Sequence, residues 1–168
     1  MSRLMRILKH RSYDEADVRR VLDNSALKRL EARVHDSETR HSGEIRLCIE
    51  AGLPTSYLWK RLSVRDRAIA MFGKLRVWDT EHNNGVLIYL LYAEHKIEIV
   101  ADRGLKAHVP DAEWQRIVEL MREPLRAGRF EEGLRIAVEA VEALLETHFA
   151  ATAGAVNTDE LANKPWIG

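Results

Sequence analysis

Hydrophobic residues recur with two different periods along the chain, and these periods separate strands from helices. Polar and apolar residues alternate over 44–50, which is typical of a half-buried strand, and the stretch 96–102 also predicts a half-buried strand. The stretch 85–92, GVLIYLLY, has no polar position, and its β-branched and aromatic residues favour a strand buried on both faces. Apolar residues three and four positions apart predict helices that start near residue 12 and that cover 26–38, 64–74, 111–127 and 130–149.

The order of these elements predicts an α/β fold. The strand at 44–50 reaches the strand at 85–92 through a helix, which is long enough for a parallel crossover. Only about three residues connect the strands 85–92 and 96–102, so these two should form an antiparallel hairpin. Because the apolar strand needs cover on both faces, we expect a three-layer α/β/α sandwich with a small mixed sheet and helices on both faces.

The length of 168 residues fits one compact domain. We expect N-terminal helices in residues 1–42 that pack on a domain core at 43–149. After residue 149 the periodicity is lost, which predicts a flexible C-terminal tail over 150–168, in which Trp166 could dock on the domain. Pro124 lies inside a predicted helix and should kink or break it.

Composition narrows the class of protein. Lys and Arg number 26, as do Asp and Glu, and a chain with no net charge lacks the basic excess that nonspecific nucleic-acid binding needs. Cys48 is the single cysteine, which excludes an internal disulfide and a cysteine-based zinc cluster. The longest apolar run, 85–93, is about half of a helical membrane span. These properties predict a soluble, cytoplasmic globular protein.

The N-terminus is basic, with Arg3, Arg6, Lys9 and Arg11 and no acidic residue. It lacks the apolar segment and the cleavage site of a secretory signal. A short basic amphipathic segment can contact anionic lipid. We expect instead a solvated tail that leads into the first helix, without peripheral membrane contact.

The predicted hairpin brings two polar segments together. Asn83 and Asn84 precede its first strand, and Asp102, Arg103 and Gly104 follow its second. Because the start of one antiparallel strand lies beside the end of the other, both groups should lie at the same end of the sheet. Loops held by a rigid sheet commonly carry function.

Neighbouring residues extend this candidate site. His108 and Asp111 lie near the start of the following helix, and Asp79 and Glu81 lie on the loop that enters the hairpin. Carboxylate and amide oxygens bind Ca²⁺ or Mg²⁺. The metal ligands predicted on this basis are Asp79, Glu81, Asn83, Asn84, Asp102 and Asp111. The alternative is that the two asparagines and Gly85 only form a turn and that the acidic residues are solvated.

Four short motifs in this order resemble the TPM domain. They are Asn84-Gly85-Val86, Gly104-Leu105, Val109-Pro110-Asp111, and FEEG at residues 130–133, and the resemblance extends over about residues 40–149. The family includes thylakoid-lumen proteins of photosystem II repair and membrane-associated bacterial proteins. Many relatives carry a signal peptide and a membrane anchor, so this chain resembles a short cytoplasmic branch.

The resemblance implies an α/β/α fold, acid phosphatase activity in some members, and a divalent cation near an Asp-Asn-Gly loop. Two residues depart from the family pattern: Asn83 stands where the family has Asp, and Asp102 stands where it has the first Gly of Gly-x-Gly-Leu. Asp102 could return the charge that Asn83 removes.

Two functional hypotheses follow. The first is a non-enzymatic binding or regulatory module with a protein partner, which binds Ca²⁺ or Mg²⁺ at this edge and needs no organic cofactor. The second is a metal-dependent phosphatase of phosphomonoesters, in which the cation polarises a phosphoryl oxygen, Arg103 neutralises developing charge and His108 donates a proton. No activated nucleophile is evident in the sequence, and the loss of a carboxylate at Asn83 favours the binding module.

Overall fold

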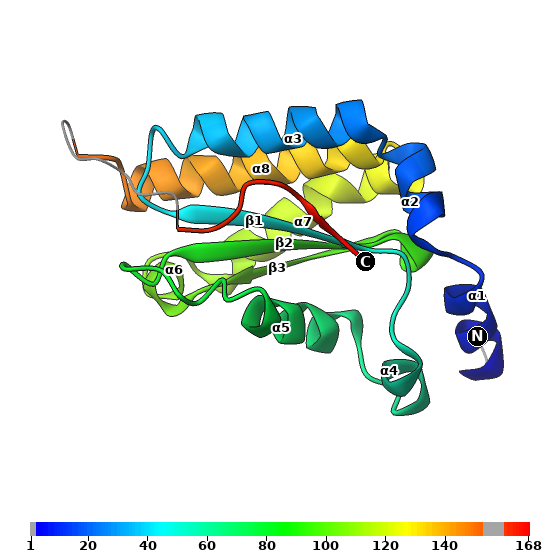
Figure 1. The fold of residues 1–168 in the computed structure, drawn as a ribbon. Helices are drawn as coiled ribbons and strands as arrows, with labels where there is room; N and C mark the ends of the chain where they lie inside the picture. The colour runs from blue at the N-terminus through cyan, green and yellow to red at the C-terminus, as the bar shows by residue number, and fades with distance from the viewer. Residues whose placement is uncertain (1–2, 153–159) are drawn as a thin grey trace.

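A mixed four-stranded sheet lies between two layers of helices (Figure 1). The computed structural model describes residues 3–152 and 160–168. The spatial order of the strands is β3-β2-β1-β4. Strand β1 is parallel to β2 and β4, and β2 is antiparallel to β3. Their bounds are β1 (Glu44–Glu50), β2 (Gly85–Leu91), β3 (Lys96–Ala101) and β4 (Trp166–Ile167).

The helices divide between the two faces of the sheet. Helices α3, α7 and α8 cover one face and α5 covers the other (Figure 1), which confirms the predicted α/β/α sandwich. A 3-10 turn, η1 (Tyr92–Glu94), connects β2 to β3. The helices are α1 (Arg3–Arg11), α2 (Glu15–Val21), α3 (Asn24–Ser37), α4 (Thr55–Trp59), α5 (Val64–Lys74), α6 (Arg103–Lys106), α7 (Asp111–Arg126) and α8 (Phe130–His148).

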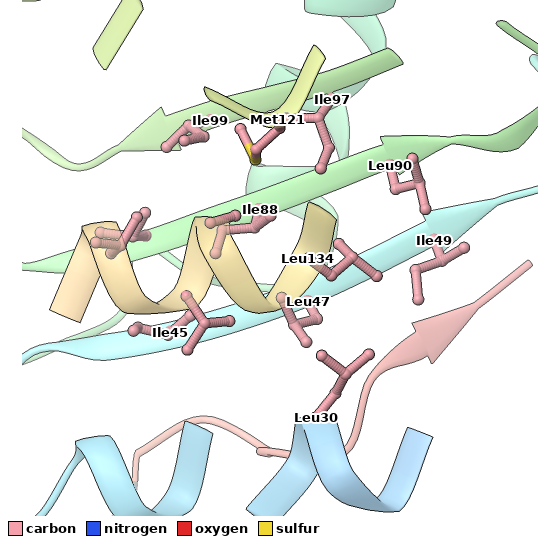
Figure 2. Packing of buried hydrophobic residues seen from close by; sticks show 14 of the residues in the cluster. Leu30, Ile45, Leu47, Ile49, Ile88, Leu90, Ile97, Ile99, Met121 and Leu134 are labelled. Atoms are coloured by element: carbon pink, nitrogen blue, oxygen red, sulfur yellow. The ribbon is translucent and has the colours of Figure 1, made fainter. Parts of the chain in front are cut away.

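Strand β2 supplies side chains to two hydrophobic cores, which explains why its sequence shows no polar alternation. Ile88 and Leu90 pack with the helices α3, α7 and α8, whereas Leu87 and Tyr89 face the layer that contains α5. All seven residues of β2 are buried. Figure 2 shows Ile88 and Leu90 of β2 in the larger core, which also contains Leu134 of α8. Each fully buried aliphatic side chain contributes about 1.5–3 kcal/mol to stability.

The register of the sheet confirms both predicted strand connections. In the hairpin, Val86 lies opposite Ala101 and Leu91 lies opposite Lys96. The parallel pair β1–β2 begins with Glu44 opposite Gly85. The entry to β2 and the exit from β3 therefore lie at the same end of the sheet.

Three segments differ from the expectations. Residues 3–11 form helix α1, where a solvated tail was expected. In the predicted tail, β4 pairs with β1, and the Gly168 amide donates to the Ile49 oxygen at 3.0 Å, so residues 160–168 pack on the sheet; residues 153–159 of that tail lie outside the described part. Helix α7 does not break at Pro124 but continues to Arg126, because the proline lies in its final turns, where only one backbone hydrogen bond is lost.

The N-terminal helices α2 and α3 belong to the same core as the sheet. Val18 and Leu22 at α2, and Leu30 and Val34 of α3, are all buried in the cluster formed with β1 and α8. Within residues 3–152 and 160–168, no helix is long and apolar enough to cross a membrane.

Candidate functional site

Two backbone hydrogen bonds join the segments on either side of the hairpin. The Asp102 amide donates to the Gly85 oxygen at 2.9 Å, and the Gly104 amide donates to the Asn83 oxygen at 2.9 Å. A Cβ atom at Gly104 would lie only 2.5 Å from the Asn83 oxygen, so the close approach requires glycine there. The predicted proximity of these two segments is confirmed.

Asn83 and Arg103 connect the same segments through their side chains. Arg103 Nε donates to Asn83 Oδ1 at 3.0 Å, and the guanidinium is exposed to solvent. Asn83 has a φ of 52°, in the left-handed region that asparagine adopts more readily than most residues. Arg103 is therefore already bound to Asn83 in this structure.

Asn84 is buried at the start of β2, and one of its polar atoms has no partner. Its backbone amide donates to Thr80 Oγ1 at 3.1 Å, and its side-chain Nδ2 donates to Ser42 Oγ at 3.3 Å. The side-chain oxygen Oδ1 is buried and accepts no hydrogen bond from any residue in 3–152 or 160–168. A buried carbonyl oxygen without a donor costs about 1–3 kcal/mol.

Asp102 shows a second buried oxygen of this kind. The residue caps α6, and its Oδ1 accepts from the Arg103 amide at 2.7 Å. Its Oδ2 is buried and has no donor among the residues described. Two oxygens, one from an amide and one from a carboxylate, are thus left without protein donors at this end of the hairpin.

The alternation of side chains sets the direction of these two groups. Asn84 lies two positions before Val86, on the face covered by α7 and α8, and its bond to Ser42 agrees with this. Asp102 lies two positions after Val100, on the face covered by α5. A ligand shared by both would therefore lie at the end of the strands rather than over one face of the sheet.

His108 lies at the edge of this site, beside the end of α8. Its ring stacks on that of His148, with centroids 5.5 Å apart, and meets Phe149 edge-on at 5.9 Å. The Phe149 oxygen accepts from the Ser42 amide at 2.8 Å, and Ser42 in turn contacts Asn84. His108 is therefore linked to the hairpin through two intermediate residues.

Other predicted ligands interact elsewhere. Asp79 forms an ion pair with Arg76, both exposed. The backbone of Glu81 donates to the Glu160 carboxylate at 3.0 Å, so this loop lies against the C-terminal segment. Asp111 lines a separate hollow of about 400 Å³ together with Glu98.

The structure thus places Asn83, Asn84, Asp102 and Arg103 at the same end of the hairpin, with the side chains of Asn84 and Asp102 on opposite faces of the sheet, and it does not gather the six predicted ligands as one set. In the described part of the chain, no three His, Cys, Asp or Glu residues are grouped so that they could hold a metal ion. A cation at the hairpin end would depend on amide and backbone oxygens beside the single carboxylate of Asp102.

Sequence reasoning missed Thr80, Ser42 and His148. Ser42 precedes β1 and reaches Asn84 only because β1 and β2 pair in parallel. The sequence predicts a loop that enters the hairpin here, but nothing in it distinguishes Thr80, whose hydroxyl accepts from the Asn84 backbone amide.

Cys48 offers no alternative nucleophile. It lies within β1, is fully buried, and its burial raises the pKa of the thiol far above the usual range. The thiol stays protonated at neutral pH, and the thiolate is the reactive form.

Comparison with known proteins identifies the family of this fold. A model of the TPM domain matches residues 14–144, a range that includes α2 and α3 as well as the sheet. The chain is also similar to the BA42 protein of the psychrophilic bacterium Bizionia argentinensis, solved by NMR, with 28% identity and a TM-score of 0.74. That similarity covers 86% of this chain and 93% of the other. No curated protein matches significantly. Because the family model matches most of its length, the chain belongs to the TPM-domain family.

Proposed function

We propose that this protein is a non-enzymatic binding module that binds a divalent cation, Ca²⁺ or Mg²⁺, at the end of the β2–β3 hairpin. The observation that supports this most is the pair of buried oxygens, Asn84 Oδ1 and Asp102 Oδ2, that have no donor in the described part of the chain. Oxygen ligands of these two types suit hard cations. The loop around Asn83 would supply further backbone oxygens, since Asn83 Oδ1 already accepts from Arg103 Nε.

The contrast with two buried carboxylates, Glu50 and Glu142, supports the proposal. Glu50 is bound by Arg67 and Tyr89, and Glu142 is bound by Arg33. Asp102 receives one backbone hydrogen bond, and its second oxygen is left without a protein donor in the part of the chain described. A carboxylate with a buried oxygen that receives no hydrogen bond from the described part of the protein is suited to a cation from solution.

The arrangement favours binding over catalysis. Cys48 is buried and protonated, and the His108 ring stacks on the ring of His148. Arg103, the group expected to neutralise phosphoryl charge, is bound to Asn83. A single carboxylate also provides less charge for holding a catalytic cation than paired carboxylates would. The protein partner of such a module stays a prediction.

A titration of the melting temperature with cation tests whether the protein binds the cation. We expect Ca²⁺ or Mg²⁺ to raise the melting temperature and a chelator to reverse the rise, because a ligand that binds only the native state stabilises it by about 2.7 kcal/mol at a hundredfold excess over Kd. Asp102→Asn should abolish the rise. Asparagine caps helices as well as aspartate does, so α6 should stay intact.

Asp79→Asn is the matched control. It removes one exposed carboxylate on the loop that enters the hairpin, where Asp79 is paired with Arg76, and should leave the response to the cation unchanged. A wild-type protein that melts at the same temperature with and without either cation would overturn the proposal. So would cation-dependent turnover of a generic phosphomonoester that disappears in Arg103→Ala, since that result would establish the phosphatase alternative.

A further inference from the structure

Helix α1 is fixed to the domain by one of its faces. His10 is buried, its Nδ1 accepts from the Leu53 amide at 3.0 Å, and its Nε2 lies 3.0 Å from Glu94 Oε1. Because Nδ1 is an acceptor, the ring proton is on Nε2 and is donated to Glu94. Arg6 Nε donates to the same carboxylate oxygen at 2.9 Å. Arg6 and His10, one turn apart, therefore determine which face of α1 points outward.

The outward face of α1 is apolar. Leu4, Met5 and Leu8 expose 68%, 60% and 62% of their surface. Leu4 and Leu8 are one turn apart in the same row, and Met5 lies next to that row. At 100° per residue, Lys9 and Arg11 lie on the two sides of this row, and both are exposed. The helix thus presents an apolar strip between two cations.

Helix α4 continues this surface. It packs against α1, and its Trp59 is 62% exposed. The Arg3 guanidinium lies 4.3 Å from the centre of the Trp59 ring, so the exposed Trp59 lies beside the first turn of α1. Lys60 and Arg61 follow directly and are also exposed. We call the surface formed by residues 3–11 and 55–61 the α1–α4 surface; in Figure 1 these two helices lie beside each other at the N-terminal end of the molecule.

The charge of the α1–α4 surface has one sign. Its two segments contain no Asp or Glu, and their six basic residues are Arg3, Arg6, Lys9, Arg11, Lys60 and Arg61. The whole chain, in contrast, has equal numbers of acidic and basic residues. The adjacent Glu94 is only 12% exposed and is bound by Arg6, His10 and Lys96, so among the six basic residues it pairs with Arg6 alone.

We propose that the α1–α4 surface docks on an anionic phospholipid membrane. Exposed aliphatic residues and a tryptophan, flanked by Lys and Arg on a short amphipathic helix, are the combination that lies in the membrane interface. The apolar strip enters the boundary between headgroups and acyl chains, and the cations contact lipid phosphates. Each basic residue near an anionic surface strengthens binding about fivefold. Residues 3–11, which were expected to form a solvated tail, form a helix with a fixed orientation. The membrane proposal depends on this orientation.

Cosedimentation with vesicles tests whether the protein binds a membrane. The full chain is mixed with vesicles of phosphatidylcholine alone or of phosphatidylcholine with phosphatidylglycerol. We expect binding to the anionic vesicles only. Binding should weaken at high salt, because the screening length falls from about 8 Å at physiological ionic strength to about 3 Å at 1 M.

Two variants of α1, each paired with a control, separate the apolar contribution to membrane binding from the electrostatic one. The double variant Leu4→Ser with Leu8→Ser removes the apolar strip, and the exposed Leu120→Ser on α7 is its control. Lys9→Glu with Arg11→Glu reverses the charge, and Lys106→Glu with Arg126→Glu, both exposed, is its control for the same change in net charge. The two α1 variants should each bind at least about tenfold more weakly, and both controls should bind like the wild type.

All these residues are exposed, so the variants should melt at the wild-type temperature, which is measured alongside. Equal binding to both types of vesicle, no binding to either, or equal losses in α1 variants and controls would overturn the proposal. It would also be overturned if Leu4→Ser with Leu8→Ser abolished self-association of the protein in the absence of lipid, since the surface would then bind a second copy.

Discussion

The Nε atom of Arg103 lies 3.0 Å from Oδ1 of Asn83, and this bond joins the exit of the hairpin to its entry. The backbone of Asn83 is left-handed, with a φ of 52°, and its oxygen accepts from the Gly104 amide. Asn83 therefore has two roles: its conformation shapes the turn, and its side chain holds Arg103.

Substitutions at Asn83 separate these roles. Asn83→Ala should lower the free energy of unfolding by about 1–2 kcal/mol, since alanine is strained in the left-handed region. Asn83→Gly relieves that strain and loses only the exposed hydrogen bond, so it should cost less than about 1 kcal/mol. Urea denaturation measures both. An Asn83→Ala variant as stable as the glycine variant would show that the backbone conformation is not what this position requires.

Two glycines should respond in opposite directions to the same substitution. A Cβ at Gly85 would lie 2.0 Å from the Val77 oxygen, so Gly85→Ala should destabilise the protein by about 1–3 kcal/mol. Gly73 lies in α5 with open space around it, so Gly73→Ala should stabilise by about 0.5–1 kcal/mol. Thermal melting compares the two. If Gly85→Ala were neutral, the close contact between β2 and the loop before it would be incorrect.

A buried network under the sheet predicts an order of mutational costs. Tyr89 donates to Glu50 Oε2 at 2.6 Å, and Arg67 Nε donates to the same oxygen at 2.8 Å. Burial, together with the nearby Glu50 carboxylate, raises the pKa of Tyr89, so its hydroxyl stays a donor. Tyr89→Phe should cost about 1.5–3 kcal/mol, because a hydrogen bond to a charged group is lost.

Glu50→Ala should cost more, about 3–5 kcal/mol, because it leaves the largely buried Arg67 guanidinium without its counter-charge. Chemical denaturation of the two variants checks the order. The reverse order would mean that the carboxylate and the guanidinium contribute little as a pair.

The lowered pKa of Glu94 predicts that the protein loses stability in acid. The hydrogen bond from His10 lowers the pKa of Glu94 to about 2, with Arg6 contributing and burial opposing, whereas 4.5 is the ordinary value. Since the folded-state pKa is depressed, the stabilisation is complete above pH 4.5 and is lost as the pH falls towards 2. The loss is on the order of 3 kcal/mol.

The measurement is urea denaturation at a series of pH values from 5 to 2.5. Glu94→Gln should flatten the dependence in this window, and Glu119→Gln, an exposed residue of α7, should keep the wild-type curve. A curve for Glu94→Gln that falls as steeply as the wild type would rule out this coupling between α1 and the hairpin turn.

The fold could be predicted where one local pattern had one explanation. An apolar stretch without alternation at 85–91 required cover on both faces, and the short connection after it required a hairpin. From these two facts followed the proximity of Asn84 to Asp102 and Arg103. Strand β4 could not be predicted, because two residues carry no period and its position depends on pairing with β1.

The candidate site could be predicted less completely from the sequence, because its contacts also depend on tertiary pairing. Asp79 lies in the right loop, but a partner three residues away, Arg76, binds it, and such a pair cannot be distinguished from a free ligand by spacing. Ser42 and Asn84 are distant in sequence and meet only through the tertiary pairing of β1 with β2. The outward apolar face of α1 likewise depends on the buried contact of His10 with Glu94.

The central claim is that a divalent cation binds at the end of the hairpin that carries Asn84 and Asp102. An NMR titration of the ¹⁵N-labelled protein with Ca²⁺ tests it directly, because each backbone amide reports separately. We predict saturable shifts at the amides of Asn84, Gly85 and residues 102–104, none at Gly73 or Gly128, and the loss of all shifts in Asp102→Asn. A spectrum unchanged by Ca²⁺, or shifts confined to other parts of the molecule such as Asp79 or Asp111, would contradict the claim.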